Sequence, residues 1–463
     1  MMDLSAWASP VRYLRLRAFP TDSEEGRIAE RYRLAVLGAI STGIARLVGV
    51  ALIALSVSWA APALGRERFG VWATFSSFTV MLSFLDLGVG NALVNRVAQA
   101  STSEDARLLP TVIMGGIFWL STIGIAAAIV LAVVGASVPW LDLFRLTSLA
   151  IADETRTAAL IFSGLFALDI LARGLLKIMA AQQRTYEAQM VSSGAAALAC
   201  PAVWWTAQHS PTIGALLLAG FGTQSFVTIA AIFWILHARS TLNFALAFSG
   251  MLHERKALLT SGTFFLFLQI GTMIGWGADS FLLAWIVGAS GVAAFAVVQR
   301  LFLFASQPVS ILNGPLWAAY ADAHARGDHR FIREALARSF ALSMAISIAV
   351  SIVLLLFGKP IVAFWTADSI SVPWALLAAF ALWTPLESAG SVLSVYLNGS
   401  GIVREQLVVV LCFCLIALPV KILAALHSGA VGLVVATTVS YALVAGGMYG
   451  GLYRKRILRS IGT

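Results

Sequence analysis

Several ionisable side chains lie inside long apolar runs of this sequence, where a charge is costly, and six of them are candidates for function. They are Arg46, Asp86, Asp279, Arg300, Glu387 and Lys421. A charge at membrane depth costs at least ~2.5 kcal/mol, so such groups usually face a bundle interior or a wet cavity. Their chemistry would be electrostatic, because a guanidinium can grip an anion through two parallel hydrogen bonds and a buried carboxylate can pair with a cation or bind a proton.

These charges fall on polar faces of predicted helices. Arg46 shares a face with Gly38, Thr42, Gly49 and Ser56, roughly 18 Å from the start of its span and hence near the bilayer centre. A second face, an arc of roughly 140°, carries Gln299, Arg300, Ser306, Gln307, Ser310 and Asn313. Two further faces carry Gln269, Thr272, Trp276, Asp279 and Ser280, and Ser76, Thr79, Ser83, Asp86 and Gly90.

Two interpretations account for these faces. In the first, Arg46 pairs with Asp86 and Arg300 pairs with Asp279 in a structural, ion-paired core. In the second, the faces enclose a water-filled central cavity with a cationic lining. We favour the cavity, because more polar groups are present than two arginines need for neutralisation. Glu387 and Lys421 fit equally well in the cavity or at helix ends, where their charges would reach the headgroups.

The elements that carry these residues are membrane-spanning helices. Of the 463 residues, 59% are hydrophobic and 11% are charged, far from the composition of a soluble chain. Apolar runs of sufficient length predict twelve spans, at about 34–61, 70–93, 110–136, 157–178, 187–207, 212–236, 259–287, 291–318, 335–357, 374–397, 405–425 and 431–452. We therefore expect an all-α polytopic membrane protein with two six-helix lobes around a central cavity.

The distribution of basic residues predicts the organisation and orientation. Most Lys and Arg residues fall on the side of the chain termini, which indicates that both termini are cytoplasmic. The expected parts are a cytoplasmic N-terminal segment (1–33), a first lobe (34–236), a cytoplasmic linker (237–258), a second lobe (259–453) and a cytoplasmic tail (454–463). The three cysteines and scattered histidines show no metal-binding pattern, so we expect no metal and no cofactor.

Three stretches resemble one transporter family. They are "LGRERFGVWATFSSF" after the first span, "LDLGVGNALVNRVAQA" at the end of the second, and "GADSFLLAWIVGASGVAAFAVVQRL" in the seventh and eighth. Together they look like the polysaccharide transporter branch (Wzx-type flippases) of the multidrug/oligosaccharidyl-lipid/polysaccharide (MOP) exporter superfamily, whose fold is MATE-like. The resemblance implies two lobes, a V-shaped cavity lined by helices one, two, seven and eight, and alternating access.

The resemblance also implies a function, which is to flip undecaprenyl-diphosphate-linked oligosaccharides across the bacterial inner membrane. The product would serve O-antigen, capsule or exopolysaccharide synthesis. Expected substrate-binding residues are Arg46, Arg300, Gln299, Gln307, Asn313, Gln269 and Trp276. Asp86, Asp279, Glu387 and Lys421 would form ion pairs or couple transport to a proton or sodium gradient. Expected partners are the lipid-linked glycan, membrane lipids, and polysaccharide polymerase and chain-length proteins, with no nucleic acid and a monomeric state.

Three other functions compete with this prediction. A multidrug or cation antiporter of the same superfamily would use an acidic cavity, whereas the first span contains Arg46 and no carboxylate. A peptidoglycan-precursor flippase would have a cationic cavity but usually more than twelve helices. A membrane glycosyltransferase or polymerase would need catalytic loops outside the membrane, and the first outer loop is predicted to be only "GRERF". We therefore expect a transporter and not an enzyme.

Overall fold

The computed structural model describes most of the chain as helix. The described residues are 24–82, 89–101, 105, 107–182, 184–239, 242, 252, 254, 275, 277–400 and 402–454. Within these ranges no strand is found. Apolar sequences form helices in a membrane because a helix satisfies its backbone hydrogen bonds internally. Each predicted span that falls on described residues coincides with helix, while most of span 259–287 lies outside them.

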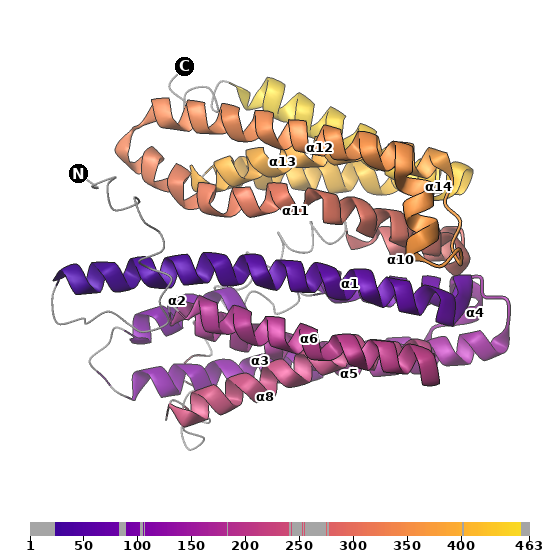
Figure 1. Ribbon diagram of the computed structural model, residues 1–463, viewed down its shortest axis with the longest axis horizontal. Helices are drawn as coiled ribbons and strands as arrows, with labels where there is room; N and C mark the ends of the chain where they lie inside the picture. Colours follow the sequence, from indigo (N-terminus) through magenta and orange to yellow (C-terminus); the bar gives the residue numbers. More distant parts are fainter. Residues whose placement is uncertain are drawn as a thin grey trace.

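The helices form two lobes that lie one above the other in Figure 1. The first lobe contains α1 (Glu24–Leu82), α2 (Val89–Ser101), α3 (Leu108–Ser137), α4 (Trp140–Leu143), α5 (Leu149–Ala181), α6 (Thr185–His209), α7 (Ile213–Leu217), the π-helical η3 (Leu218–Gly222) and α8 (Thr223–Ala238). The second contains α10 (Asp279–Ile286), α11 (Ala289–Arg326), α12 (His329–Trp365), α13 (Trp374–Gly399), α14 (Val403–Gly447) and the π-helical η6 (Met448–Leu452). The fold prediction of two helical lobes is confirmed.

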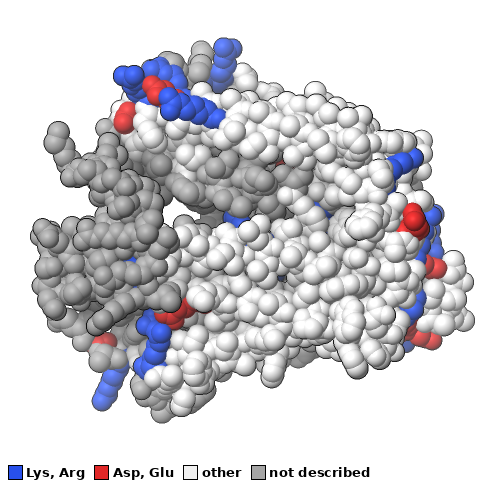
Figure 2. Space-filling view, viewed as in Figure 1, with Lys and Arg blue, Asp and Glu red and all other residues white. Residues whose placement is uncertain are grey.

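The surface has the polarity of a membrane-spanning protein. Large apolar side chains such as Trp234, Phe364 and Leu415 are 72%, 91% and 76% exposed. Figure 2 shows most of the visible Lys, Arg, Asp and Glu atoms near the two ends of the long axis, with a largely uncharged surface between them. Among the described residues, seven continuous helical stretches are long and apolar enough to cross a bilayer. Two of these join consecutive predicted spans: Val36–Phe78 covers the first span and the start of the second, and Arg404–Leu452 covers the last two.

Two predicted loops are much shorter than expected. The first and second spans form one helix, α1, interrupted only at Gly65, whose φ of 72° and ψ of 171° are non-helical. The predicted loop "GRERF" is therefore wrong beyond its glycine, because Arg66, Glu67 and Arg68 are already helical. Likewise α14 joins the last two spans across Ser428 and Gly429. A glycine at positive φ turns the chain without the cost that a Cβ atom would add.

The lobes meet mainly where α1 packs against α11. The end of the molecule that contains α4, at the right of Figure 1, is called the α4 end below, and the first turns of α1 lie at the opposite end. At that opposite end Arg96 of α2 donates two hydrogen bonds, of 2.6 and 2.7 Å, to the fully buried Glu254. These bonds raise the pKa of Arg96 and tie the segment between the lobes to the first lobe.

Candidate substrate cavity

A cavity of about 570 Å³ lies between the two lobes. It is lined from the first lobe by α1, α6, α7, η3 and α8, and from the second by α10, α11, α13 and α14. Its position agrees with the predicted central cavity, and its lining includes the four predicted helices together with four further spans. Cavities of this size commonly bury a ligand the size of a disaccharide or a drug.

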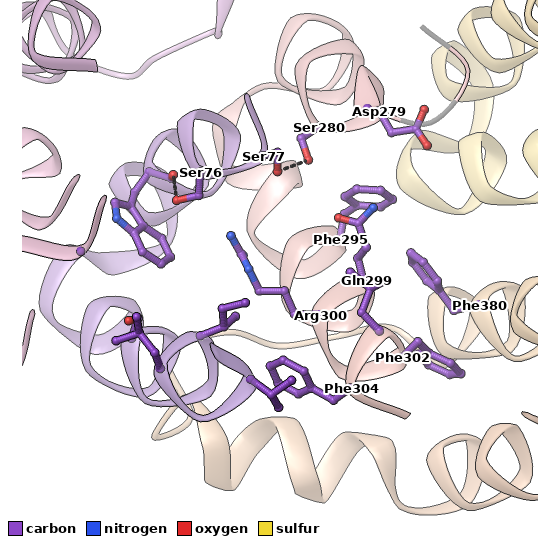
Figure 3. A pocket seen from close by; sticks show the side chains of 18 of the residues that line it. Ser76, Ser77, Asp279, Ser280, Phe295, Gln299, Arg300, Phe302, Phe304 and Phe380 are labelled. Atoms are coloured by element: carbon purple, nitrogen blue, oxygen red, sulfur yellow. Dashed lines mark hydrogen bonds between the residues drawn. The ribbon is translucent and has the colours of Figure 1, made fainter. Parts of the chain in front are cut away.

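Arg300 of α11 reaches across the cavity toward the other lobe. Figure 3 shows its side chain pointing to the part of α1 that carries Ser76 and Ser77. The guanidinium carbon lies 5.3 Å from the centre of the Trp72 ring, which is a cation–π contact between the lobes. Its Nη1 is buried and donates to no acceptor within the described part of the chain. The arrangement leaves hydrogen-bond donors of a permanent cation available to a ligand.

Asp279 and Lys421 form a buried pair inside the second lobe. Lys421 Nζ donates to Asp279 Oδ1 at 2.8 Å and to the carbonyl oxygen of Gly275 at 2.6 Å. The Lys421 side chain is 1% exposed and that of Asp279 is 11% exposed. The pair joins α10 to α14, so the pairing of Asp279 with Arg300 that the ion-paired alternative proposed is wrong. Because Lys421 neutralises Asp279, this carboxylate does not cancel the charge of Arg300.

Glu387 of α13 borders the cavity on the second-lobe side. It also lines a second cavity of about 290 Å³ between α13 and α14. Trp383 and Phe380 line the main cavity on the same side. Glu387 is thus a cavity residue and not a helix-end residue.

The other predicted binding residues have different outcomes. Gln299 lines the cavity, beside Phe295 and Phe380 in Figure 3. Arg46 is half-buried in α1 and is not among the described residues that line the cavity, which α1 approaches at Val50 and Ser56. Asp86, Gln269 and Trp276 lie outside the described residues, as do the side chains of Gln307 and Asn313 in α11. Their roles stay predictions.

Aromatic side chains of the cavity were missed by the sequence analysis. Trp72, 6% exposed, lies one helical turn before Ser76 and therefore extends the polar face of the second span. Phe295, Phe302, Phe304, Phe380 and Trp383 also line the cavity. Extending the predicted polar face by one turn would have identified Trp72. Nothing in the spacing separates the phenylalanines from lipid-facing ones.

The cavity combines the guanidinium of Arg300, several hydroxyl and amide groups, and aromatic faces. Ser77 and Ser280 hydrogen-bond across the lobes with an Oγ–Oγ distance of 3.1 Å. Such a lining can bind an anionic group at Arg300 and sugar hydroxyls at the polar side chains. No cluster of three or more metal-ligating side chains occurs among the described residues.

Comparisons with known proteins agree with this architecture. Residues 265–423 match the family model described as MatE. No curated protein matches the chain. An inward-facing multidrug resistance MATE family transporter of the MOP superfamily is similar at 14% identity, covering 91% of this chain and 99% of its own, with a TM-score of 0.75.

Two other solved structures have a similar fold. The lipid II flippase MurJ, in an inward closed conformation, has 14% identity over 90% of this chain and 87% of its own, with a TM-score of 0.66. A MOP superfamily transporter from Pyrococcus furiosus, described as having a binding pocket of reversed polarity, has 15% identity over 93% and 96%, with a TM-score of 0.64. These likenesses establish a polytopic membrane protein with a MOP-type fold.

Proposed function

We propose that the chain is a transporter that flips undecaprenyl-diphosphate-linked oligosaccharides across the bacterial inner membrane by alternating access. The observation that supports this most directly is Arg300, whose guanidinium lies in the cavity between the lobes with Nη1 buried and no protein acceptor on it among the described residues. A diphosphate is an anion that lipid excludes. A guanidinium binds phosphate oxygens through paired, charge-assisted hydrogen bonds, which gives Arg300 the role of holding the diphosphate.

The remaining lining suits the glycan. Ser56, Ser76, Gln224, Gln299 and Thr384 line the cavity with hydroxyl and amide groups that can hydrogen-bond to sugar hydroxyls. Aromatic rings such as Trp72 and Trp383 offer flat faces to sugar rings. The prenyl tail is too long for a cavity of about 570 Å³ and would stay in the lipid while the headgroup crosses. Arg46, Gln269, Gln307, Asn313 and Trp276 remain proposed contacts along the path of the headgroup.

The proposed orientation places the α4 end in the periplasm and both chain termini in the cytoplasm. The basic-residue distribution of the sequence supports it. Asp86 and Glu387 are proposed to bind a coupling proton or sodium ion, and Asp279 with Lys421 to act as an ion pair. The proposed partners are membrane lipids together with the polysaccharide polymerase and chain-length proteins that receive the flipped glycan, and the proposed transporter is a monomer.

A complementation experiment tests the role of Arg300. The gene is deleted in its host, and wild-type protein, Arg300→Lys or Arg300→Ala is returned at matched membrane levels. We expect Arg300→Ala to lower surface polysaccharide by about tenfold or more, because a hydrogen bond to a charged group contributes about 1.5–3 kcal/mol. Lipid-linked oligosaccharide should accumulate inside. Arg300→Lys should restore export in part, since lysine keeps the charge without the planar fork.

The control for that experiment is Arg330→Ala, because the Arg330 side chain is 84% exposed and away from the cavity. It should export as the wild type does. Unchanged polysaccharide in the Arg300→Ala strain, at normal protein levels, would contradict the proposal. If deletion of the gene itself leaves both surface polysaccharide and lipid-linked intermediates unchanged, the substrate class is wrong.

Glu387 favours a second candidate function, export of organic cations. A half-buried carboxylate beside Phe380 and Trp383 is a suitable site for a cation with aromatic character. The two candidate functions predict opposite effects of substitutions at Glu387 and Arg300 on transport. An exporter of cations should lose drug resistance with Glu387→Gln and keep it with Arg300→Ala, whereas a flippase of the anionic lipid should depend on Arg300.

A further inference from the structure

The two lobes are joined at the α4 end by a compact junction, formed by Gly70, Phe144, Arg145, Gly288, Ala289 and Ser290. The backbone N–H of Ala289 in the second lobe donates to the carbonyl oxygen of Phe144 in the first, at 3.0 Å. Arg66 Nε donates to the carbonyl oxygen of Ser290 at 3.2 Å. These bonds close the molecule at the end where α11 begins.

Gly70 makes the closest contact in this junction. It is buried in α1, and a Cβ atom at this position would lie 1.8 Å from the carbonyl oxygen of Ala289 and 2.6 Å from its carbonyl carbon. Both atoms belong to the backbone of α11, so no change of side-chain rotamer could relieve the overlap. A substituent at residue 70 can therefore be accommodated only if α1 and α11 move apart.

The start of α11 is also restrained on its other side. Gly288 has φ +91°, a conformation that favours glycine, and a Cβ there would lie 3.3 Å from the Phe144 carbonyl oxygen. Its neighbour Arg145 has φ +49°. The first turn of α11 thus fits between α1 and the turn that follows α4, and small displacements of α11 in the closed arrangement are resisted from both directions.

We infer that this junction is the gate that closes the cavity at the α4 end. We also infer that the gate can close only because glycine at position 70 lets α1 and α11 come into contact. The same two helices carry Trp72 and Arg300, whose cation–π contact also crosses between the lobes. Opening the junction would therefore separate the guanidinium from its aromatic partner. The inference concerns the conformation of the protein and does not depend on which substrate is carried.

Distance measurements between spin labels test this inference on the purified full chain without substrate. Labels are placed at Leu149→Cys in the first lobe and Ser371→Cys in the second, both exposed positions at the α4 end, after Cys200, Cys412 and Cys414 are replaced by alanine. We expect Gly70→Ala to raise the fraction of molecules with a long distance between the two labels about tenfold. An effect of this size is typical of overpacking in a close-packed core. An unchanged distance distribution in folded Gly70→Ala protein would overturn the inference.

A matched control is Gly164→Ala in α5, where an added Cβ meets no atom within 4 Å. It should leave the distribution as in the wild type, and an equal shift in this control would also overturn the inference. If Gly70→Ala does not fold, Arg66→Ala replaces it, because it removes one hydrogen bond of the same junction. We expect Arg66→Ala to raise the fraction of molecules with a long distance between the labels about twofold to fivefold. An unchanged fraction in this variant would contradict the inference.

Discussion

At the scale of single residues, Lys421 and Asp279 show how a charge can remain inside a membrane helix. Each is buried, and each supplies the other with a charge-assisted hydrogen bond. Lys421 also donates to Gly275 and lies 5.9 Å from the centre of the Phe413 ring. The cost of desolvating two ions is offset only while both are present, because removal of one leaves an uncompensated charge.

Breaking this pair should destabilise the second lobe. We expect Lys421→Met or Asp279→Asn alone to lower the free energy of unfolding by about 3–5 kcal/mol, whereas the double variant should recover most of the loss. The measurement is the thermal midpoint of the purified protein in one detergent. Arg330→Ala serves as the control, since its exposed ion pair with Glu334 should matter little. A double variant that loses as much stability as the two single variants added together would show that the two residues act independently, and would contradict the pairing.

The same residues show what the sequence can and cannot predict about the site. Hydropathy and helical spacing correctly predicted Arg300 and Gln299 as residues of an interior cavity. The ion-paired alternative named the wrong partner for Asp279, which binds Lys421, 142 residues away on α14. Periodicity defines the face of one helix, but which faces meet depends on the packing of helices that are distant in sequence.

At the scale of elements, the break in α1 depends on one residue. Gly65 has φ 72° and ψ 171°, in a region of backbone space that is nearly restricted to glycine. The residues on either side are helical, and Pro62 lies one turn earlier. Because no loop of several residues is present to absorb a change, the direction of the second span depends directly on this glycine.

Gly65→Ala should therefore weaken the α4 end of the first lobe. We expect a loss of about 1–3 kcal/mol in stability, the cost of a side chain in this backbone region. The readout is the thermal midpoint of the purified protein. Gly49→Ala in the same helix is the matched control, since its added Cβ meets no atom within 4 Å and its helical backbone suits alanine. Equal losses in the two variants would contradict the proposed role of the Gly65 conformation.

The membrane-spanning helices could be predicted from the sequence, but the connections between them could not. Long apolar runs determine where helices cross a membrane, so the spans on described residues were correctly placed. The charges of Arg66, Glu67 and Arg68 suggested a loop. In the structure they remain helical because their side chains find partners: Glu67 accepts from Thr147 at 2.7 Å, and Arg68 pairs with Glu154 at 2.6 Å. Such contacts satisfy the charges without unwinding the helix.

At the scale of the whole molecule, the lobes are held together by contacts between α1 or α4 and the second lobe. Trp365 Nε1 donates to the carbonyl oxygen of Ala54 at 2.7 Å, and Ser77 meets Ser280 across the cavity wall. The sequence predicted two lobes from the central polar linker and the two sets of six spans. It contained no signal for the end at which they close, because that depends on the balance between two arrangements of the same helices.

Alternating access requires these contacts to break in each transport cycle, and Ser77 with Ser280 allows a reversible test. Their Oγ atoms are 3.1 Å apart, so cysteines at both positions lie close enough to form a disulfide bond between α1 and α10. In a background with Cys200, Cys412 and Cys414 replaced by alanine, we expect oxidised Ser77→Cys/Ser280→Cys protein to lose surface-polysaccharide export. A reducing agent should restore it.

The single variants Ser77→Cys and Ser280→Cys separate locking of the lobes from loss of a hydroxyl group. Each should export glycan under oxidising and reducing conditions alike, because neither can form the cross-link. Normal export by the double variant, with the disulfide confirmed by a mobility shift, would mean that the lobes do not separate at this contact. Failure of both single variants would instead assign the two hydroxyl groups to substrate binding, since a serine that only connects the lobes can be replaced one at a time.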